Sequence, residues 1–248
     1  MQIVNQHLQY PRAPLVEPNR SGYIHVGIEV DRSRLPFFLF TSNAKKTILA
    51  RAKSFAESLA GRSEVKAANV FRAVVRPPVN QPYLEAVSDR FHVARYDVAV
   101  LIETQDAGAA RAIRDSQEFR DFQDFINDLA KFVHVVVTEN ARRIAEVDKS
   151  RPGVFLFNYF FSERPEDLLA VWEYTAGWFI KETGLDNSTL MIPAAGEASE
   201  YGVINHCRWD SLPRLMPSLI FKKSMQTYVM ENFAANKIAV MPILYRLA

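Results

Sequence analysis

The run INHCRWD at residues 204–210 places an imidazole, the single thiol of the chain, a guanidinium and an indole side by side. Neighbouring side chains of a β-strand point to opposite faces, so His206 and Arg208 share one face while Cys207 lies on the other. This pattern argues against a nucleophile–base pair of Cys207 with His206. One interpretation of His206 is a proton acceptor or ligand anchor, with Arg208 holding an anionic group through its bidentate fork. The alternatives are a hydrogen-bonded core histidine and, for Cys207, a small buried hydrophobe.

A lone amide interrupts the apolar stretch VFLFNYFF at residues 154–161. An unsatisfied buried polar group costs ~1–3 kcal/mol, so Asn158 either ties down backbone or contacts a ligand. The helix expected at residues 166–183 has two apolar stripes, which is typical of a helix that is buried or lines a cavity. We predict two groups of site residues for a flat apolar molecule: a catalytic group, His206, Asn158 and Arg208, and a ligand-binding group, Trp172, Trp178 and Tyr159.

The other histidines are better explained as structural residues. His25 and His134 each lie in the middle of an expected strand, and His92 lies in a long loop where we expect it to be solvated. The first two would join His206 in a metal site only if three strands converged, which their spacing does not indicate. We therefore predict no metal, and whether His25 and His134 line a second pocket stays open.

Several classes of function are excluded by what the sequence lacks. The glycine-rich phosphate-binding motifs, the HExxH and CxxC motifs and the GxSxG elbow are absent, so we expect no organic cofactor. Lys and Arg number 30 against 28 Asp and Glu, a balance that predicts no nucleic-acid partner. No apolar run approaches the ~20 residues of a membrane helix, and the N-terminal stretch does not resemble a secretory signal. Together with the single cysteine, these features predict a cytoplasmic protein without a membrane partner.

The chemistry-bearing residues lie on elements that repeat. Residues 1–22 contain three prolines and no periodicity, and we expect an extended arm. Alternation and helical spacing then predict strands at 23–30, 65–75, 96–103 and 132–138, with helices at 43–59 and 107–129. Strands follow at 154–161, 189–194, 201–209 and 237–247, with helices at 165–183 and 212–233. The order β-α-β-β-α-β, a split βαβ unit, therefore occurs twice.

The polar stretch EVDKSRPG at residues 146–153 separates two halves, residues 23–148 and 153–248. Two helices cover only one face of a four-stranded sheet, and the stretch at 154–161 is apolar on both faces, so the other face also needs cover. We predict an α+β fold in which tandem ferredoxin-like halves pack sheet to sheet. The result is a pseudo-dimeric α+β barrel within one chain.

This element order resembles the dimeric α/β-barrel superfamily, which includes antibiotic-biosynthesis-monooxygenase-like and stress-responsive barrel domains. The run DSQEF at 115–119 and the residues Trp209-Asp210-Ser211 carry the likeness. In the haem-degrading members, an Asn on the first strand is a pocket residue and the second helix carries a His. Here Asn158 matches the first feature, but Glu118 stands where the histidine is expected, and the helix after Trp209 has none.

Two hypotheses of function follow. The resemblance implies an enzyme without organic cofactor that oxygenates or isomerises an aromatic or polyketide-like substrate. The alternative is a non-catalytic barrel that binds an apolar ligand or assembles with itself, and a haem-binding barrel is a third reading. An enzyme should show His206 reaching a cavity with another polar group, whereas a binding protein should show it tied to backbone. The sequence leaves open whether the chain is an enzyme and whether it forms a homo-oligomer.

Overall fold

The computed structural model describes residues 1–31, 36–77 and 81–248. Its first part contains β1 (Gly22–Glu29), α1 (Asn43–Leu59), β2 (Val65–Val75), α2 (Pro82–Val87), β3 (Val98–Thr104), α3 (Ala107–Arg114), α4 (Gln117–Asn127) and β4 (Phe132–Arg143). The second part contains β5 (Val154–Ser162), α5 (Pro165–Thr183), β6 (Thr189–Pro193), β7 (Val203–Trp209), α6 (Leu212–Phe221), the π-helix η1 (Met225–Met230), α7 (Glu231–Ala235) and β8 (Ile238–Leu247).

The strands form one closed barrel in the order β1-β3-β2-β8-β5-β7-β6-β4, and the pairs between them are antiparallel. Read from β4 and from β8, both groups of four strands follow one order, β4-β1-β3-β2 and β8-β5-β7-β6. The pairs β2–β8 and β4–β6 join the two groups. The predicted pseudo-dimeric α+β barrel is therefore confirmed, and closure leaves no sheet edge to protect.

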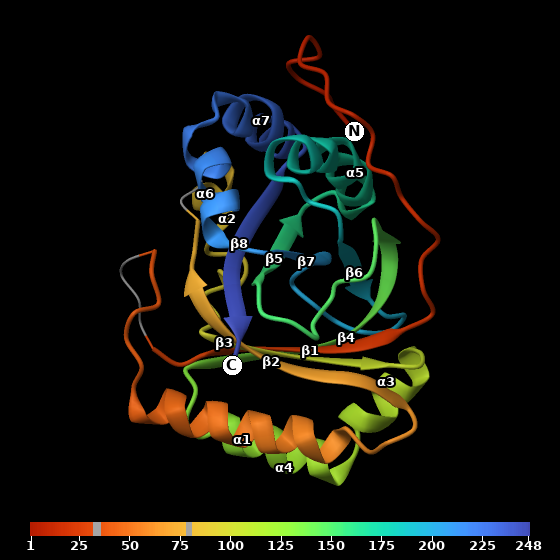
Figure 1. Ribbon diagram of the computed structural model, residues 1–248, viewed down its shortest axis with the longest axis vertical. Coiled ribbons are helices and arrows are strands. Elements are labelled where there is room, and N and C mark those ends of the chain that lie inside the picture. The colour runs from red at the N-terminus through yellow and green to blue at the C-terminus, as the bar shows by residue number, and fades with distance from the viewer. Residues whose placement is uncertain (32–35, 78–80) are drawn as a thin grey trace.

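Helices cover the outside of the barrel at its two ends in the view of Figure 1, with α1, α3 and α4 on one side and α5, α6 and α7 on the other. Strand alternation divides the apolar residues between a barrel interior and two outer layers under these helices. Strand β5 shows why both faces are apolar. Phe155, Phe157 and Tyr159 lie in the interior cluster, whereas Leu156 and Phe160 pack under the helices of the second half.

Helix α5 positions one wall of the space under those helices. Pro165 stands in its first turn, where the missing N–H removes no hydrogen bond, and Gly184 ends it with a left-handed φ of 68°. The helix is buried on more than one stripe, as predicted, since Leu168, Trp172 and Trp178 are all buried. In the part of the chain that the structure describes, no helix is long and apolar enough to cross a membrane.

One prediction about local structure was wrong. The stretch at 77–95 was expected to be a loop, but it contains α2, which begins at Pro82. Pro242 lies in β8, between β2 and β5 in the barrel. A proline inside a strand predicts an unpaired edge or a bulge, and the structure has both close to this position. The proline is tolerated because pairing of β8 with β2 ends at Leu244, next to a bulge between Ala73 and Val75, so β8 is paired only with β5 at Pro242.

The N-terminal arm runs from the second-half helices along the side of the barrel to β1 (Figure 1). Two asparagines near α7 bind its backbone in both directions. The Val4 N–H donates to Asn232 Oδ1 at 2.9 Å, and Asn232 Nδ2 donates to the Val4 carbonyl at 3.3 Å. Asn236 forms the same pair with Gln2, at 2.6 and 2.7 Å. Each amide side chain therefore binds the N–H and the carbonyl of one arm residue, as the backbone of a neighbouring β-strand would.

The arm also depends on a glycine of α5, which gives a testable prediction. A Cβ at Gly177 would lie 1.8 Å from the Pro11 carbonyl oxygen, a backbone atom that cannot rotate away. We expect Gly177→Ala to push the arm off the helix, to lower the free energy of unfolding by about 1–3 kcal/mol, and to expose the arm to protease. Limited proteolysis followed by mass spectrometry measures the exposure.

The matched control is Gly61→Ala, because no atom lies within 4 Å of a Cβ there. That variant should be cut like the wild type. An arm that stays protected in Gly177→Ala would show that the close approach to Pro11 does not hold it.

Candidate functional site

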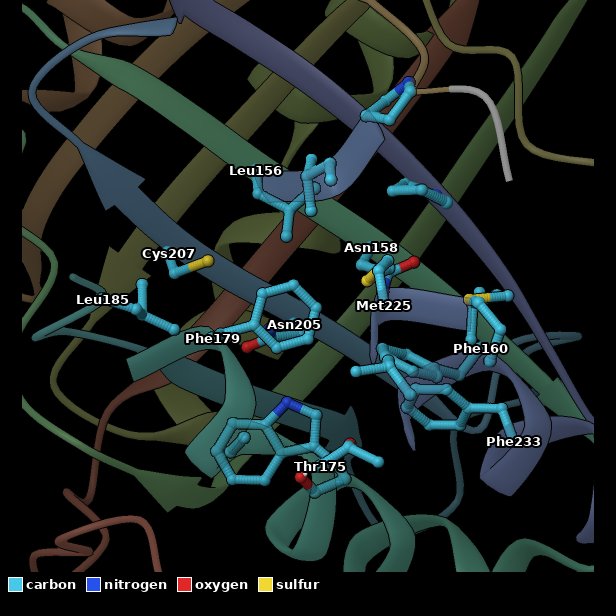
Figure 2. A pocket seen from close by; sticks show the side chains of 18 of the residues that line it. Leu156, Asn158, Phe160, Thr175, Phe179, Leu185, Asn205, Cys207, Met225 and Phe233 are labelled. Carbon is cyan, nitrogen blue, oxygen red and sulfur yellow. Dashed lines mark hydrogen bonds between the residues drawn. The ribbon is translucent and has the colours of Figure 1, made fainter. Parts of the chain in front are cut away.

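A cavity lies between the outer face of the second-half sheet and the helices that cover it. It has a volume of about 60 Å³. Strands β5, β7 and β8 supply one wall, and α5, η1 and α7 supply much of the other (Figure 2). The residues that line this helix-side cavity are Pro77, Leu156, Asn158, Phe160, Trp172, Thr175, Ala176, Phe179, Leu185, Asn205, Cys207, Trp209, Leu219, Met225, Val229, Met230, Phe233, Val240 and Pro242.

Two strand amides supply much of the polarity of the cavity. Asn158 on β5 is directly opposite Asn205 on β7, and Figure 2 shows both side chains on the side of the sheet that faces the helices. Asn205 Oδ1 accepts a hydrogen bond from Ser188 Oγ at 2.6 Å, which holds that amide in place. Asn158 Oδ1 is buried and has no hydrogen-bond partner among the described residues. It is therefore an acceptor available to a ligand.

The apolar walls combine fixed and adaptable side chains. The Trp209 indole is fixed, because its Nε1 donates to Thr183 Oγ1 at 3.0 Å. Met225 and Met230 are the first and last residues of the π-helix η1. Unbranched methionine side chains fill irregular gaps and move easily, and π-helical turns occur frequently at functional sites. The cavity can therefore change its shape on the η1 side.

His206 lies on the opposite face of the sheet, inside the barrel. It pairs with Phe157 across β5 and β7, and the two rings stack with centroids 4.3 Å apart. Its Nδ1 lies 3.0 Å from the Leu156 carbonyl oxygen, which only accepts, so Nδ1 carries the proton and Nε2 keeps a lone pair. Burial lowers the His206 pKa well below its usual value. His206 and Asn158 therefore do not meet, and the expectation that they share one cavity was wrong.

Arg208 supports the segment between the two halves. Its Nη2 donates to the Pro152 carbonyl at 2.6 Å, and its Nη1 donates to Asp210 Oδ1 at 3.1 Å. Its backbone N–H donates to Asn187 Oδ1 at 2.8 Å. The guanidinium is thus engaged by backbone and by a neighbouring carboxylate, and it does not line the helix-side cavity.

The three predicted wall residues are divided between different places. Trp172 lines the helix-side cavity. Trp178 is fully buried in the apolar layer under the second-half helices, outside the lining of the cavity, and donates its Nε1 hydrogen to Ser224 Oγ at 2.9 Å. Tyr159 lies in the barrel interior with its hydroxyl 3.1 Å from His25 Nε2. Among the predicted residues, the structure therefore brings together only Asn158 and Trp172.

The remaining histidines of the strands also lie inside the barrel. The rings of His25 and His134 have centroids 6.3 Å apart, and burial lowers the pKa of both. No group of three potential ligands that could hold a metal ion occurs among residues 1–31, 36–77 and 81–248. His92 was expected to be solvated, but it stacks on Phe132 and lies 3.0 Å from a Glu29 carboxylate oxygen.

Sequence reasoning missed Asn205 as a site residue, although a signal was present. It is an amide in an apolar strand, as is Asn158, and strand alternation places it on the same face as Cys207. What was lacking was the register that pairs Asn205 with Asn158. Cys207 also lines the cavity, and burial raises the pKa of its thiol well above the usual value. This agrees with its interpretation as a small buried hydrophobe.

Comparison with solved structures shows what the fold resembles. An anthrone oxidase-like protein aligns with 95% of this chain and 94% of its own, with a TM-score of 0.67 and 10% sequence identity. A provisionally assigned monooxygenase from Fusobacterium nucleatum aligns with a TM-score of 0.55 and 9% identity over 92% of this chain and 93% of its own. Another, from Lactobacillus acidophilus, gives 0.52 and 8% over 92% and 94%. These likenesses show that the chain shares the overall fold of these three proteins.

Sequence comparisons add nothing to this likeness. No protein-family model matches the chain, and neither does any curated protein.

The residues that line the cavity do not fit a haem. None of them is a histidine, and no Arg or Lys is among them to bind the propionates. The reading of this chain as a haem-binding barrel therefore finds no donor set here.

Proposed function

We propose that this chain binds a small, flat, largely apolar molecule in the helix-side cavity and oxidises it with O2, without an organic cofactor. The observation that carries the proposal is the buried Asn158 Oδ1, which lacks a partner within the described residues. An unpaired buried acceptor costs ~1–3 kcal/mol, so a ligand that donates a hydrogen bond to it relieves that cost. A phenolic or enolic aromatic molecule meets both requirements of the cavity.

The likeness to an anthrone oxidase-like protein supports this choice of chemistry. An anthrone is a three-ring aromatic ketone with an acidic methylene group. Its oxidation by O2 to the anthraquinone removes two hydrogens from that carbon and adds one oxygen atom, while the second oxygen leaves as water. The reaction balances without any other reductant. An enzyme for it must hold the enolate and keep the rings away from bulk water.

The described lining of the cavity supplies a hydrogen-bond partner for the substrate oxygen and no base. The enol tautomer of the substrate can donate its O–H to Asn158 Oδ1, and once that proton has left, Asn158 Nδ2 can donate to the same oxygen. Such a donor stabilises an oxyanion strongly in a dry site. Among the described lining residues none is a base at neutral pH, since burial raises the pKa of the Cys207 thiol. The proton must therefore pass to water, which restricts substrates to molecules that ionise readily.

The cavity must also widen to admit such a molecule. A volume of about 60 Å³ holds less than one aromatic ring with its contacts. The side chains of Met225 and Met230 are the parts of the wall that can move most easily. We expect ligand entry to displace them while the strand wall around Asn158 stays fixed.

A non-catalytic apolar-ligand-binding protein is the second candidate. The observation in its favour is that His206 faces the barrel interior, where its Nδ1 is bound to the Leu156 carbonyl, so it supplies no base to the cavity. Binding without O2 consumption would support this candidate over the first.

The test of the oxidase proposal uses Asn158→Leu with anthrone as the probe. Anthrone should quench the fluorescence of Trp172 and Trp209, which line the cavity, in wild type and variant alike. O2 consumption should fall at least about tenfold in the variant, because the donor to the developing oxyanion is lost. An oxygen electrode and absorbance of the quinone product measure the rate.

The matched control is Asn69→Leu. Asn69 also has a buried Oδ1 without a described partner, but it lies on β2, outside the lining of the cavity. This variant should oxidise anthrone at the wild-type rate. A wild-type rate in Asn158→Leu would remove Asn158 from the mechanism, and a failure of anthrone to quench fluorescence would remove the cavity as its binding site.

A further inference from the structure

A second hollow, of about 390 Å³, adjoins the helix-side cavity. Pro77, Val240 and Pro242 line both, so the two spaces share one wall. We call this hollow the arginine groove, because it is lined by Arg76 and Arg95. It lies beside the part of β8 that is not paired with β2, because the pairing of these two strands ends at Val75 and Leu244.

In the groove, the Gln81 side chain forms the backbone hydrogen bonds that β2 would otherwise form with β8. Gln81 accepts a hydrogen bond from the Val240 N–H at 2.8 Å and donates one to the Val240 carbonyl at 2.6 Å. Both ends of this buried amide are therefore used by the backbone. Gln81 satisfies β8 without filling the space beside it, and it has little capacity left to bind a ligand.

The two arginines have no acidic partner. Within the described residues, neither guanidinium forms an ion pair or a side-chain hydrogen bond. Burial and then the charge of Arg95 lower the Arg76 pKa, whereas Glu29 opposes this change. The Glu29 carboxylate lies against His92 instead, at 3.0 Å. Two like charges thus face one groove, and an anion between them would relieve their repulsion.

We propose that the ligand of the helix-side cavity is an amphiphilic acid, whose rings occupy the cavity and whose carboxylate is bound by Arg76 and Arg95 in the adjoining groove. This inference rests on the proposed function, and it names the class of molecule that the site takes. Arginine suits the role because its planar fork binds a carboxylate through two parallel hydrogen bonds. The anion-binding role expected of Arg208 therefore passes to two arginines that form no ion pair with any residue the structure describes.

The test compares 2-naphthoate with 2-naphthamide, which have the same rings and differ in charge. Isothermal titration of the full chain should show naphthoate binding roughly tenfold more tightly, as expected for hydrogen bonds to a charged group. Arg76→Gln should remove that preference, so that both ligands bind with the affinity of the amide. Arg95→Gln should reduce the preference less, because Arg95 is more exposed to solvent.

The control variant is Arg120→Gln on α4, whose guanidinium bonds within its own helix region, and it should leave the preference unchanged. Equal binding of the two ligands to the wild type, or an unchanged preference in Arg76→Gln, would overturn the inference and leave the proposed function standing. Failure of both ligands to bind would overturn the proposed function and the inference together.

Discussion

Acidification from pH 7 to pH 5 is expected to remove most of the stability of this protein. His25, His134 and His206 are all buried within the barrel, and burial is the main reason that the pKa of each is lowered. The unfolded chain takes up protons on these groups near pH 6.5, whereas the folded chain does not. The free energy of unfolding is therefore highest above about pH 6.5. It decreases as the pH falls below that value, because only the unfolded chain binds protons at these histidines.

The size of the effect follows from proton linkage. Each such histidine contributes a slope of up to about 1.4 kcal/mol per pH unit, so three contribute about 4 kcal/mol per unit below pH 6. The total stability of a typical domain is about 5–15 kcal/mol. Urea unfolding at a series of pH values between 7.5 and 4.5 measures the slope.

One variant isolates a single histidine. The His134 pKa is lowered to about 4, and its ring lies 4.8 Å from that of Tyr201, among aromatic neighbours that suit a phenyl ring. His134→Phe should reduce the slope by about 1.4 kcal/mol per pH unit between pH 6.5 and 4. His7→Gln changes an exposed histidine of the arm and should leave the slope as in the wild type. A wild-type stability that stays flat from pH 7 to 5 would contradict the buried neutral state.

Replacement of Lys45 by Met is expected to destabilise the fold by about 3–5 kcal/mol. Lys45 Nζ lies 3.1 Å from Asp97 Oδ1, and both side chains are almost fully buried. Asp97 Oδ2 also accepts hydrogen bonds from the N–H groups of Val30 and Asp31, at 2.8 and 3.1 Å. Removing the cation leaves a buried carboxylate without its counter-charge. Urea unfolding at pH 7.5 gives the change in free energy.

A second substitution separates charge from packing. Lys45→Met combined with Asp97→Asn should recover at least half of the loss, because no unpaired charge is then buried. Lys46→Met changes the exposed neighbour on α1 and should stay within about 0.5 kcal/mol of the wild type. Wild-type stability in Lys45→Met would mean that the pair does not hold α1 against the barrel.

Local patterns in the sequence predicted most of the elements well. Helix α1 and strand β2 have the expected limits, 43–59 and 65–75. Alternation correctly placed His206 and Cys207 on opposite faces of β7, and the two apolar parities of β5 correctly required cover on both sides. These features follow from backbone geometry within one element, which repeats every two or about 3.6 residues.

The composition of the site could not be predicted in the same way. Alternation assigns each side chain to a face of its own strand, but it does not say which face of β5 matches which face of β7. The register pairs Asn158 with Asn205 and Phe157 with His206, and so separates two residues that were expected to act together. The catalytic roles of Asn158 and His206 remain predictions.

Local patterns in the sequence predict the order of the elements, the buried face of each and the need to bury both sides of β5. Each of these features depends on neighbours a few residues away. Closure of the barrel brings Arg76 and Pro77 beside Val240 and Pro242, and it turns the histidines of three strands toward one interior. The two sets of residues that meet at the groove are more than a hundred positions apart in the sequence. Long-range strand pairing and the path of the chain beyond β2 create these contacts, and periodicity carries no information about either.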